Sequence, residues 1–271
     1  MTAEEKTSLA LFLDTAEDSL RDGYRKPRNA CAFTGDPPPA PLPLGMGPSR
    51  EAEGSGESDS KESSDSLESL AAEVRVCTAC PLHRARLKAV PGEGAARPLV
   101  MVIGEGPGAD EDASGRPFVG RAGQLLDKML ASIGLFRERN CFIANVVKCR
   151  PPGNRDPQPE EIAGCAPFLA RQIRLLQPRL ILSAGKVATQ ALLHTAEGIG
   201  RLRGRFAEYR LPQSGPSEAA AIPLLPTYHP SALLRDESLK RPAWEDLKTL
   251  RAKLSELDEQ YALAMDGSPQ V

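Results

Sequence analysis

Four runs of apolar residues follow one another along the chain after residue 67. They are LVMVIG, CFIANVV, LILSAG and IPLLPTY, at 99–104, 141–147, 180–185 and 222–228. Segments with apolar residues at helical spacing lie between and after them, near 121–134, 159–176, 185–194 and 242–262. Strands that are apolar throughout and alternate with helices are typical of a parallel sheet covered on both faces. The pattern therefore predicts an α/β domain whose functional loops follow the carboxyl ends of the strands.

The start of the chain has a different composition. Residues 35–66 are rich in Pro, Gly, Ser and acidic residues and have almost no large apolar side chains, so they cannot bury enough surface to offset the entropy lost on ordering. Residues 1–70 contain 7 Lys or Arg and 14 Asp or Glu, a net charge of −7, whereas the remaining residues contain 27 and 22, a net charge of +5. We therefore predict a largely disordered acidic, Pro/Ser-rich extension over 1–66, one folded domain over 67–262 and a short flexible tail over 263–271.

The sequence gives no sign of export or membrane insertion. No apolar run has the length of a membrane-spanning helix, and the amino terminus lacks the basic-then-apolar order of a secretory signal. The expected location is cytoplasmic, where the six cysteines are metal ligands or free thiols rather than disulfides. The mildly basic body is compatible with a phosphate-bearing partner.

Four cysteines have a spacing that suits a metal centre. Cys77 and Cys80 form a CxxC pair before the first apolar run, Cys149 follows the second run, and Cys165 lies in the next helical segment. All-thiolate ligation permits zinc or an iron–sulfur cluster, and the wide spacing of the second pair argues against a zinc ribbon. The alternative is that Cys149 and Cys165 are buried core thiols. Cys31 and Cys141 are not expected to be ligands.

The loop after the first run reads GEGPGADEDASGRPFVG, at 104–120. Its glycines loosely satisfy a dinucleotide-binding fingerprint. We discount that hypothesis because an acidic run would face the pyrophosphate and no clear helix is expected directly behind the glycines. A carboxylate here can instead stabilise a sugar cation or position water, and Phe118 can stack on an extruded base, although a lone Phe is more often a core residue.

Two polar residues lie at the ends of other predicted strands. Asn145 interrupts an apolar strand, where its side chain needs hydrogen-bond partners and can read the edge of a base. His229 lies in TYHPS, where Pro230 ends the strand, and a neutral imidazole could donate to a leaving-group oxygen. Each residue alone is more often structural, but at adjacent strand ends they would line one pocket.

The ordered set of these motifs resembles a known family. CxxCPL, GEGPGADED, GRPFVGRAG, NVVKCRPPGNRDP with its later cysteine, and TYHPS follow one another at the spacings found in the family-4, iron–sulfur uracil-DNA glycosylases. The resemblance covers about residues 68–255 and leaves the extension outside it. It implies a three-layer α/β sandwich with a central four-stranded parallel sheet flanked by helices. It also implies removal of uracil from single- or double-stranded DNA by a nucleoid-associated repair enzyme.

Several site roles follow from the resemblance alone. A [4Fe–4S] cluster would be held by Cys77, Cys80, Cys149 and Cys165. Phe118 should stack on uracil, Asn145 should read its pairing edge and His229 should hydrogen-bond its departing O2. The remaining substrate contacts are expected from the backbone of Gly104, Gly106 and Gly108 and from Ser231.

The group that activates water is left open. The wider superfamily has a catalytic Asp or Asn where this chain has Gly106. The candidates are Glu105, Glu111 and Asn154, of which Glu111 is favoured because its loop holds the nearest carboxylates. No histidine occurs in KCRPPGNRDP, so covalent trapping of the sugar is not expected.

The sequence also suggests how DNA is held. Phosphates would contact Arg150, Arg155 and Arg235, and a loop with Ser231, Leu233 and Leu234 would wedge into the duplex. We expect a monomer whose extension could contact a replication or repair protein. The alternatives are a non-catalytic, DNA-binding superfamily module of a replication protein and a zinc-stabilised binding domain.

Overall fold

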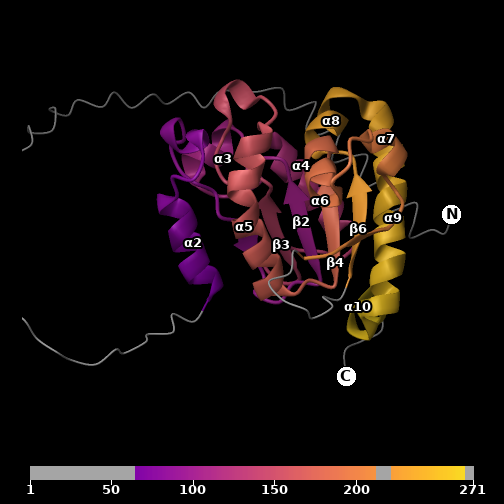
Figure 1. Cartoon of the computed structure of the whole chain (residues 1–271). Coiled ribbons are helices and arrows are strands. Elements are labelled where there is room, and N and C mark those ends of the chain that lie inside the picture. Colours follow the sequence, from indigo (N-terminus) through magenta and orange to yellow (C-terminus); the bar gives the residue numbers. More distant parts are fainter. Residues whose placement is uncertain (1–64, 212–220, 266–271) are drawn as a thin grey trace, which may run out of the picture.

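The computed structural model describes residues 65–211 and 221–265, and this part forms one six-stranded sheet in the order β1-β3-β2-β4-β6-β5. Its four central strands, β2 (Val100–Gly104), β3 (Cys141–Asn145), β4 (Leu180–Ala184) and β6 (Ile222–Thr227), are parallel. They coincide with the four apolar runs, which confirms the α/β class and the parallel core (Figure 1).

The sheet has two more strands than the four predicted parallel ones. β1 (Glu93–Gly94) pairs antiparallel with β3, and β5 (Ala207–Tyr209) pairs antiparallel with β6. These edge strands have two and three residues, too few to show any periodicity in the sequence.

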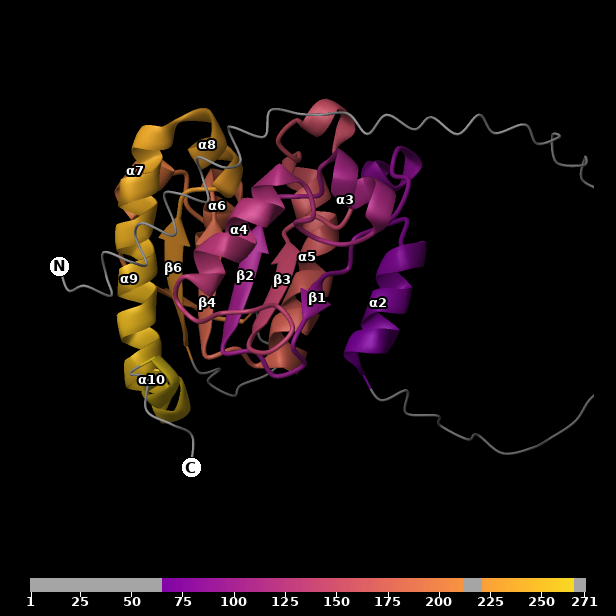
Figure 2. The same ribbon diagram turned by 180° about the vertical axis from the view of Figure 1, so that it is seen from behind.

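Helices cover both faces of the sheet. Val100 and Val102 of β2 face α4 (Arg121–Ala131), α8 (Pro230–Arg235), α9 (Lys240–Leu257) and α10 (Glu259–Met265), which Figure 2 shows in front of or beside the sheet. Met101 and Ile103 face the other core, made with α2 (Leu67–Val76), α5 (Pro159–Leu176) and α6 (Lys186–Leu193). This alternation confirms three layers, with both sides of the strands buried.

The first and last described helices lie near the predicted ends of the folded domain. Ser66 caps α2, and its side chain accepts a hydrogen bond from the amide of Ser69, so the helix begins at the predicted start of the domain. At the other end, α10 continues to Met265, three residues beyond the predicted domain end. The predicted extension up to residue 64 and the last six residues of the predicted tail lie outside the described residues. None of the described helices is long and apolar enough to cross a membrane.

Short helical elements also occur in the described part of the chain, one before the first strand and the others after the parallel strands. They are η1 (Pro81–Arg84), α3 (Ala109–Ser114), η2 (Pro152–Asn154), α7 (Ile199–Leu202) and η3 (Glu237–Leu239). The expectation that no helix opens behind the glycines is wrong, because α3 begins at Ala109. Its first turn contains three carboxylates. They interact favourably with the positive end of the helix dipole but would repel a phosphate bound there.

Candidate active site

One cavity of about 600 Å³ opens at the carboxyl edge of the sheet. Glu105 and Phe118 line it from the β2 side, Asn145 from the end of β3, Lys186 from the start of α6, and His229 from the end of β6. The same cavity is lined by Gly106, Gly108, Glu111, Asn154 and Ser231. The structure thus brings together residues that are separated by more than a hundred positions in the sequence.

Asn145 presents an unpaired hydrogen-bond acceptor to this cavity. Its side chain is 1% exposed, and its Oδ1 is the one buried side-chain polar atom without a partner in the described part of the chain. A buried amide oxygen without a partner costs about 1–3 kcal/mol, so it is expected to meet a donor when a ligand binds.

Gly104 lets two site residues approach each other. A Cβ on Gly104 would lie 2.5 Å from Cζ of Phe118 and 2.6 Å from Oδ1 of Asn145. A side chain at this position would therefore displace the ring, the amide or both.

Phe118 is held in an unusual backbone conformation. Its φ is 51°, in the left-handed region that bulky residues rarely adopt, and its ring centroid lies 5.6 Å from that of His229. Buried Arg137 donates from Nη2 to the carbonyl oxygen of Phe118 at 3.0 Å and from Nη1 to that of Pro117 at 3.1 Å. The ring is therefore positioned as part of the cavity wall.

Glu111 fixes the two loops on either side of α3. Its Oε1 accepts hydrogen bonds from the amides of Val119 and Gly120 at 2.8 and 2.9 Å, and its Oε2 accepts one from the amide of Gly108 at 3.0 Å. Both carboxylate oxygens are thus engaged with the backbone.

His229 is oriented by the first turn of α8. Its Nδ1 accepts a hydrogen bond from the backbone amide of Ser231 at 3.1 Å, which leaves Nε2 to carry the proton of the neutral ring. Burial, helped by the positive charge of Arg235, lowers the pKa of His229 to about 4. The side chain is therefore a neutral donor at physiological pH.

Glu105 is a carboxyl group of the cavity whose pKa is shifted by its surroundings. It is half-buried, and burial raises the pKa of Glu105 to about 7, with a further contribution from Asp156 and an opposing one from Lys186. A carboxyl group with a pKa near the working pH suits proton transfer.

The four predicted cysteine ligands line a second, small cavity. It lies between α2, η1, the end of β3 and α5, and it is lined by Cys77, Cys80, Cys149 and Cys165. Arg86 donates from Nη1 to Sγ of Cys149 at 3.1 Å. Among the described residues, however, no group of three or more His, Cys, Asp or Glu side chains is arranged to hold a metal ion.

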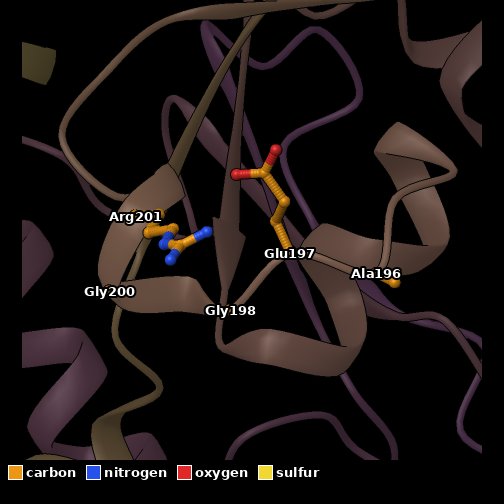
Figure 3. Close-up of a pocket in the computed structure, with 5 residues that line it drawn as sticks. All are labelled: Ala196, Glu197, Gly198, Gly200 and Arg201. Carbon is orange, nitrogen blue, oxygen red and sulfur yellow. The ribbon is translucent and has the colours of Figure 1, made fainter.

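A shallow hollow lies at the turn before α7, outside both cavities. Figure 3 shows Glu197 and Arg201 on its sides, with Gly198 directly before α7 and Gly200 inside that helix. Its two charges are of opposite sign, and no residue predicted for the site lies in it.

Comparisons with known proteins agree with this arrangement. Residues 91–248 match the uracil DNA glycosylase superfamily, which is more than half of the chain. The chain belongs to this superfamily. It is 42% identical over 196 residues to the type-4 uracil-DNA glycosylase of Saccharolobus solfataricus, an alignment that covers 70% of this chain and 88% of the relative. The type-4 enzymes of Pyrobaculum aerophilum and Thermotoga maritima are 43% and 41% identical, over 67% and 69% of this chain and 91% and 93% of theirs.

Two expectations about this superfamily member need correction. Leu233 cannot be a DNA wedge, because it lies in α8 and is fully buried in the core, where Leu234 also packs. Glu111 faces the cavity, but its three bonds to backbone amides indicate a structural role rather than the favoured one in water activation.

The predicted DNA-contacting arginines differ in their surroundings. Arg155 is held by both carboxylate oxygens of buried Glu161, at 2.7 and 2.8 Å. Nε of Arg150 donates to Oδ1 of Asn154 at 2.8 Å. Asn154 is the third candidate for water activation, and this bond already engages its amide oxygen. Arg235 is exposed beside Ser231.

Sequence reasoning missed several residues of this superfamily member's site. Lys186 and Asp156 line the cavity, and Lys186 follows the apolar run LILSAG directly, a position that could have marked it. The role of Arg137 could not be predicted from its position in the sequence. It lies in an irregular segment, and its contact with Phe118 forms only when the chain folds.

Proposed function

We propose that this chain hydrolyses the N-glycosidic bond of uracil in DNA and leaves an abasic site. The unpaired Oδ1 of Asn145 carries this proposal. The pairing edge of uracil offers an N3–H donor beside carbonyl acceptors, so one amide can accept from N3 and donate to a carbonyl. Cytosine has an acceptor at N3 and would leave Oδ1 unpaired, at a cost of about 1–3 kcal/mol.

The target base has to leave the duplex to reach Asn145. The cavity is enclosed by the ring of Phe118 and the loops after the strands, and the buried amide lies at its inner end. An extruded uracil would stack on Phe118 and place its pairing edge against Asn145, as base-flipping enzymes require.

Bond cleavage follows a dissociative, monofunctional course in this proposal. The bond between N1 and C1′ breaks with its electron pair leaving on uracil, and the Nε2–H of neutral His229 donates to the oxygen on which charge develops. Water adds to the sugar cation, and its proton passes to the carboxylate of Glu105. Glu105 is preferred to Glu111 and Asn154 because no hydrogen bond to its carboxylate is found within the described residues.

The four cysteines fit an iron–sulfur cluster. They line one cavity from three separate segments, and their thiol chemistry matches such a group. A cluster spreads its ligands over its corners, so the sulfur atoms need not converge on one point. Held by Cys77, Cys80, Cys149 and Cys165, a [4Fe–4S] cluster would supply a structural cross-link between the CxxC segment, the end of β3 and α5.

The remaining parts of the proposal concern DNA and its setting. Exposed Arg235 and Lys186 line the cavity, and half-buried Arg150 is bonded to Asn154 of its wall, so positive charge surrounds it for single- or double-stranded DNA. We further propose a cytoplasmic, nucleoid-associated monomer whose extension contacts a replication or repair protein.

The test is release of the base from an oligonucleotide with a single uracil, followed as strand cleavage after alkali. We expect cleavage at uracil and none at cytosine or thymine in the same position. His229→Ala should lower the single-turnover rate by about 10²–10³ while the protein stays folded. Binding without any base release by the wild type would instead support the non-catalytic module of a replication protein.

A further inference from the structure

Lys148 is a fully enclosed lysine between the two cavities. Its side chain is 2% exposed, and it lines the cysteine cavity. Its Nζ donates to the carbonyl oxygen of Asn145 at 2.9 Å and to Oε1 of Gln172 on α5 at 2.6 Å. Burying an ammonium group costs free energy unless the charge is paired and hydrogen-bonded. The presence of Lys148 at this position therefore needs a physical explanation.

The bonds of Lys148 connect the base-reading residue to the cysteine-bearing segments. The backbone amide of Lys148 donates to Sγ of Cys165 at 3.3 Å, and its carbonyl oxygen accepts from the amide of Val90 at 2.7 Å. Gln172 passes the connection on, because its Nε2 donates to the carbonyl oxygen of Pro91 at 2.6 Å. One side chain thus ties the end of β3 to α5 and to the segment that follows the CxxC pair.

The charge of Lys148 has no carboxylate partner within the described residues. The two oxygens that accept from its Nζ are neutral, and Lys148 lines the cavity of the four thiols, with its backbone amide bonded to Sγ of Cys165. In an iron–sulfur cluster held by four cysteines, the negative charge of the four thiolates would exceed the positive charge of the iron–sulfide core. The centre as a whole would therefore be negative. A fixed positive charge at this wall would therefore stabilise the loaded site.

We propose that Lys148 is a positioning residue that supplies the counter-charge of the four-cysteine centre and holds the main chain of Asn145 in its base-reading place. The counter-charge rests on the proposed four-cysteine cluster, and the positioning of Asn145 rests on the proposed uracil excision. The counter-charge concerns the metal centre, whatever the substrate is.

Gln172 allows the charge to be tested without removing the lysine. Gln172→Glu and Gln172→Met both lose the bond to Pro91, but only the first places a carboxylate on the ammonium group. We expect Gln172→Glu to lose iron to a chelator about tenfold faster than Gln172→Met, followed as absorbance at about 400 nm and as iron content. Equal rates of loss would overturn the counter-charge.

Lys148→Met tests the connection to Asn145, with Lys253→Met, a partly exposed lysine of α9, as the control. In the iron-loaded fraction of Lys148→Met, we expect KM for a uracil oligonucleotide to rise about tenfold and kcat to stay near the wild-type value. The affinity for an oligonucleotide with an abasic-site analogue should not change, because it presents no base edge. An unchanged KM, or an equal loss of affinity for both oligonucleotides, would overturn the positioning role.

Two safeguards keep these outcomes separate. If Lys148→Met does not fold, Gln172→Met gives the KM comparison, since it removes one of the two acceptors of the ammonium group. If the wild type releases no uracil, the proposed function fails, while the chelator experiment still decides whether Lys148 supports the metal centre.

Discussion

At the scale of single residues, the site depends on two groups whose charge is set by burial. Burial keeps His229 neutral by lowering its pKa to about 4, and it raises the pKa of Glu105 to about 7. At any pH well above 4, His229 remains a neutral hydrogen-bond donor. Glu105 changes from the neutral acid to the carboxylate as the pH rises through about 7. The proposed mechanism therefore makes a specific demand on pH.

We expect the single-turnover rate of the wild type to fall as the pH drops below about 7, because Glu105 takes up a proton and can no longer accept one from water. Glu105→Gln should be slower by about 10²-fold at pH 8 and lack this acid limb. Rates measured from pH 5 to 9 on a uracil oligonucleotide check both points. An unchanged acid limb in Glu105→Gln would exclude Glu105.

At the scale of elements, α3 organises the site although it has only six residues. Glu111 bonds to the loops before and after the helix, and buried Asp112 accepts a hydrogen bond from the amide of Leu87 at 2.9 Å. Adjacent carboxylates on one short helix thus hold the Phe118 loop on one side and the segment after the CxxC pair on the other.

Glu111→Gln should lower the free energy of unfolding by about 1–3 kcal/mol, because an amide cannot accept at both ends and one charge-assisted bond is lost. We expect Glu111→Gln to have a lower kcat/KM, because the loop that carries Phe118 is held less firmly. The pH dependence of its rate should stay that of the wild type. Asp110→Asn removes a charge from the same helix and serves as the control in urea unfolding. Loss of the acid limb in Glu111→Gln would return Glu111 to the role of base.

How far the sequence could predict this fold depended on the length of each element. The four apolar runs placed the central strands to within about two residues, and α5 matches its predicted range. β1, α3 and β5 were missed because two to six residues carry too little pattern. Asn145 and His229 line one cavity as predicted, but the prediction of adjacent strand ends is wrong, because β2 and β4 lie between β3 and β6. Arg137, Lys148 and the burial of Leu233 depend on contacts between distant segments, which periodicity does not report.

At the scale of the whole molecule, the cysteine cavity joins segments that the sheet does not hold together. Cys77 and Cys80 lie outside the sheet, while Cys149 and Cys165 belong to the loop after β3 and to α5. A cross-link there would act on the loops near the active site more than on the central strands.

Cys77→Ala should therefore lose bound iron and speed hydrogen exchange over 77–90 and 148–166, with little change at β2 and β4. Cys141→Ala is the control, because Cys141 is buried in the opposite core away from the cavity and should keep its iron. Mass-spectrometric exchange and iron analysis provide the readouts. Equal acceleration over the whole sheet would show that the centre supports the entire fold.

The two short edge strands also bear on how copies of the chain meet. β1 and β5 occupy the outer sides of β3 and β6, and β6 contains Pro223 and Pro226, which have no N–H to offer. The longer parallel strands therefore expose little of the unpaired backbone that invites edge-to-edge aggregation. Short edge strands of this kind lower the tendency of the sheets of two copies to join edge to edge.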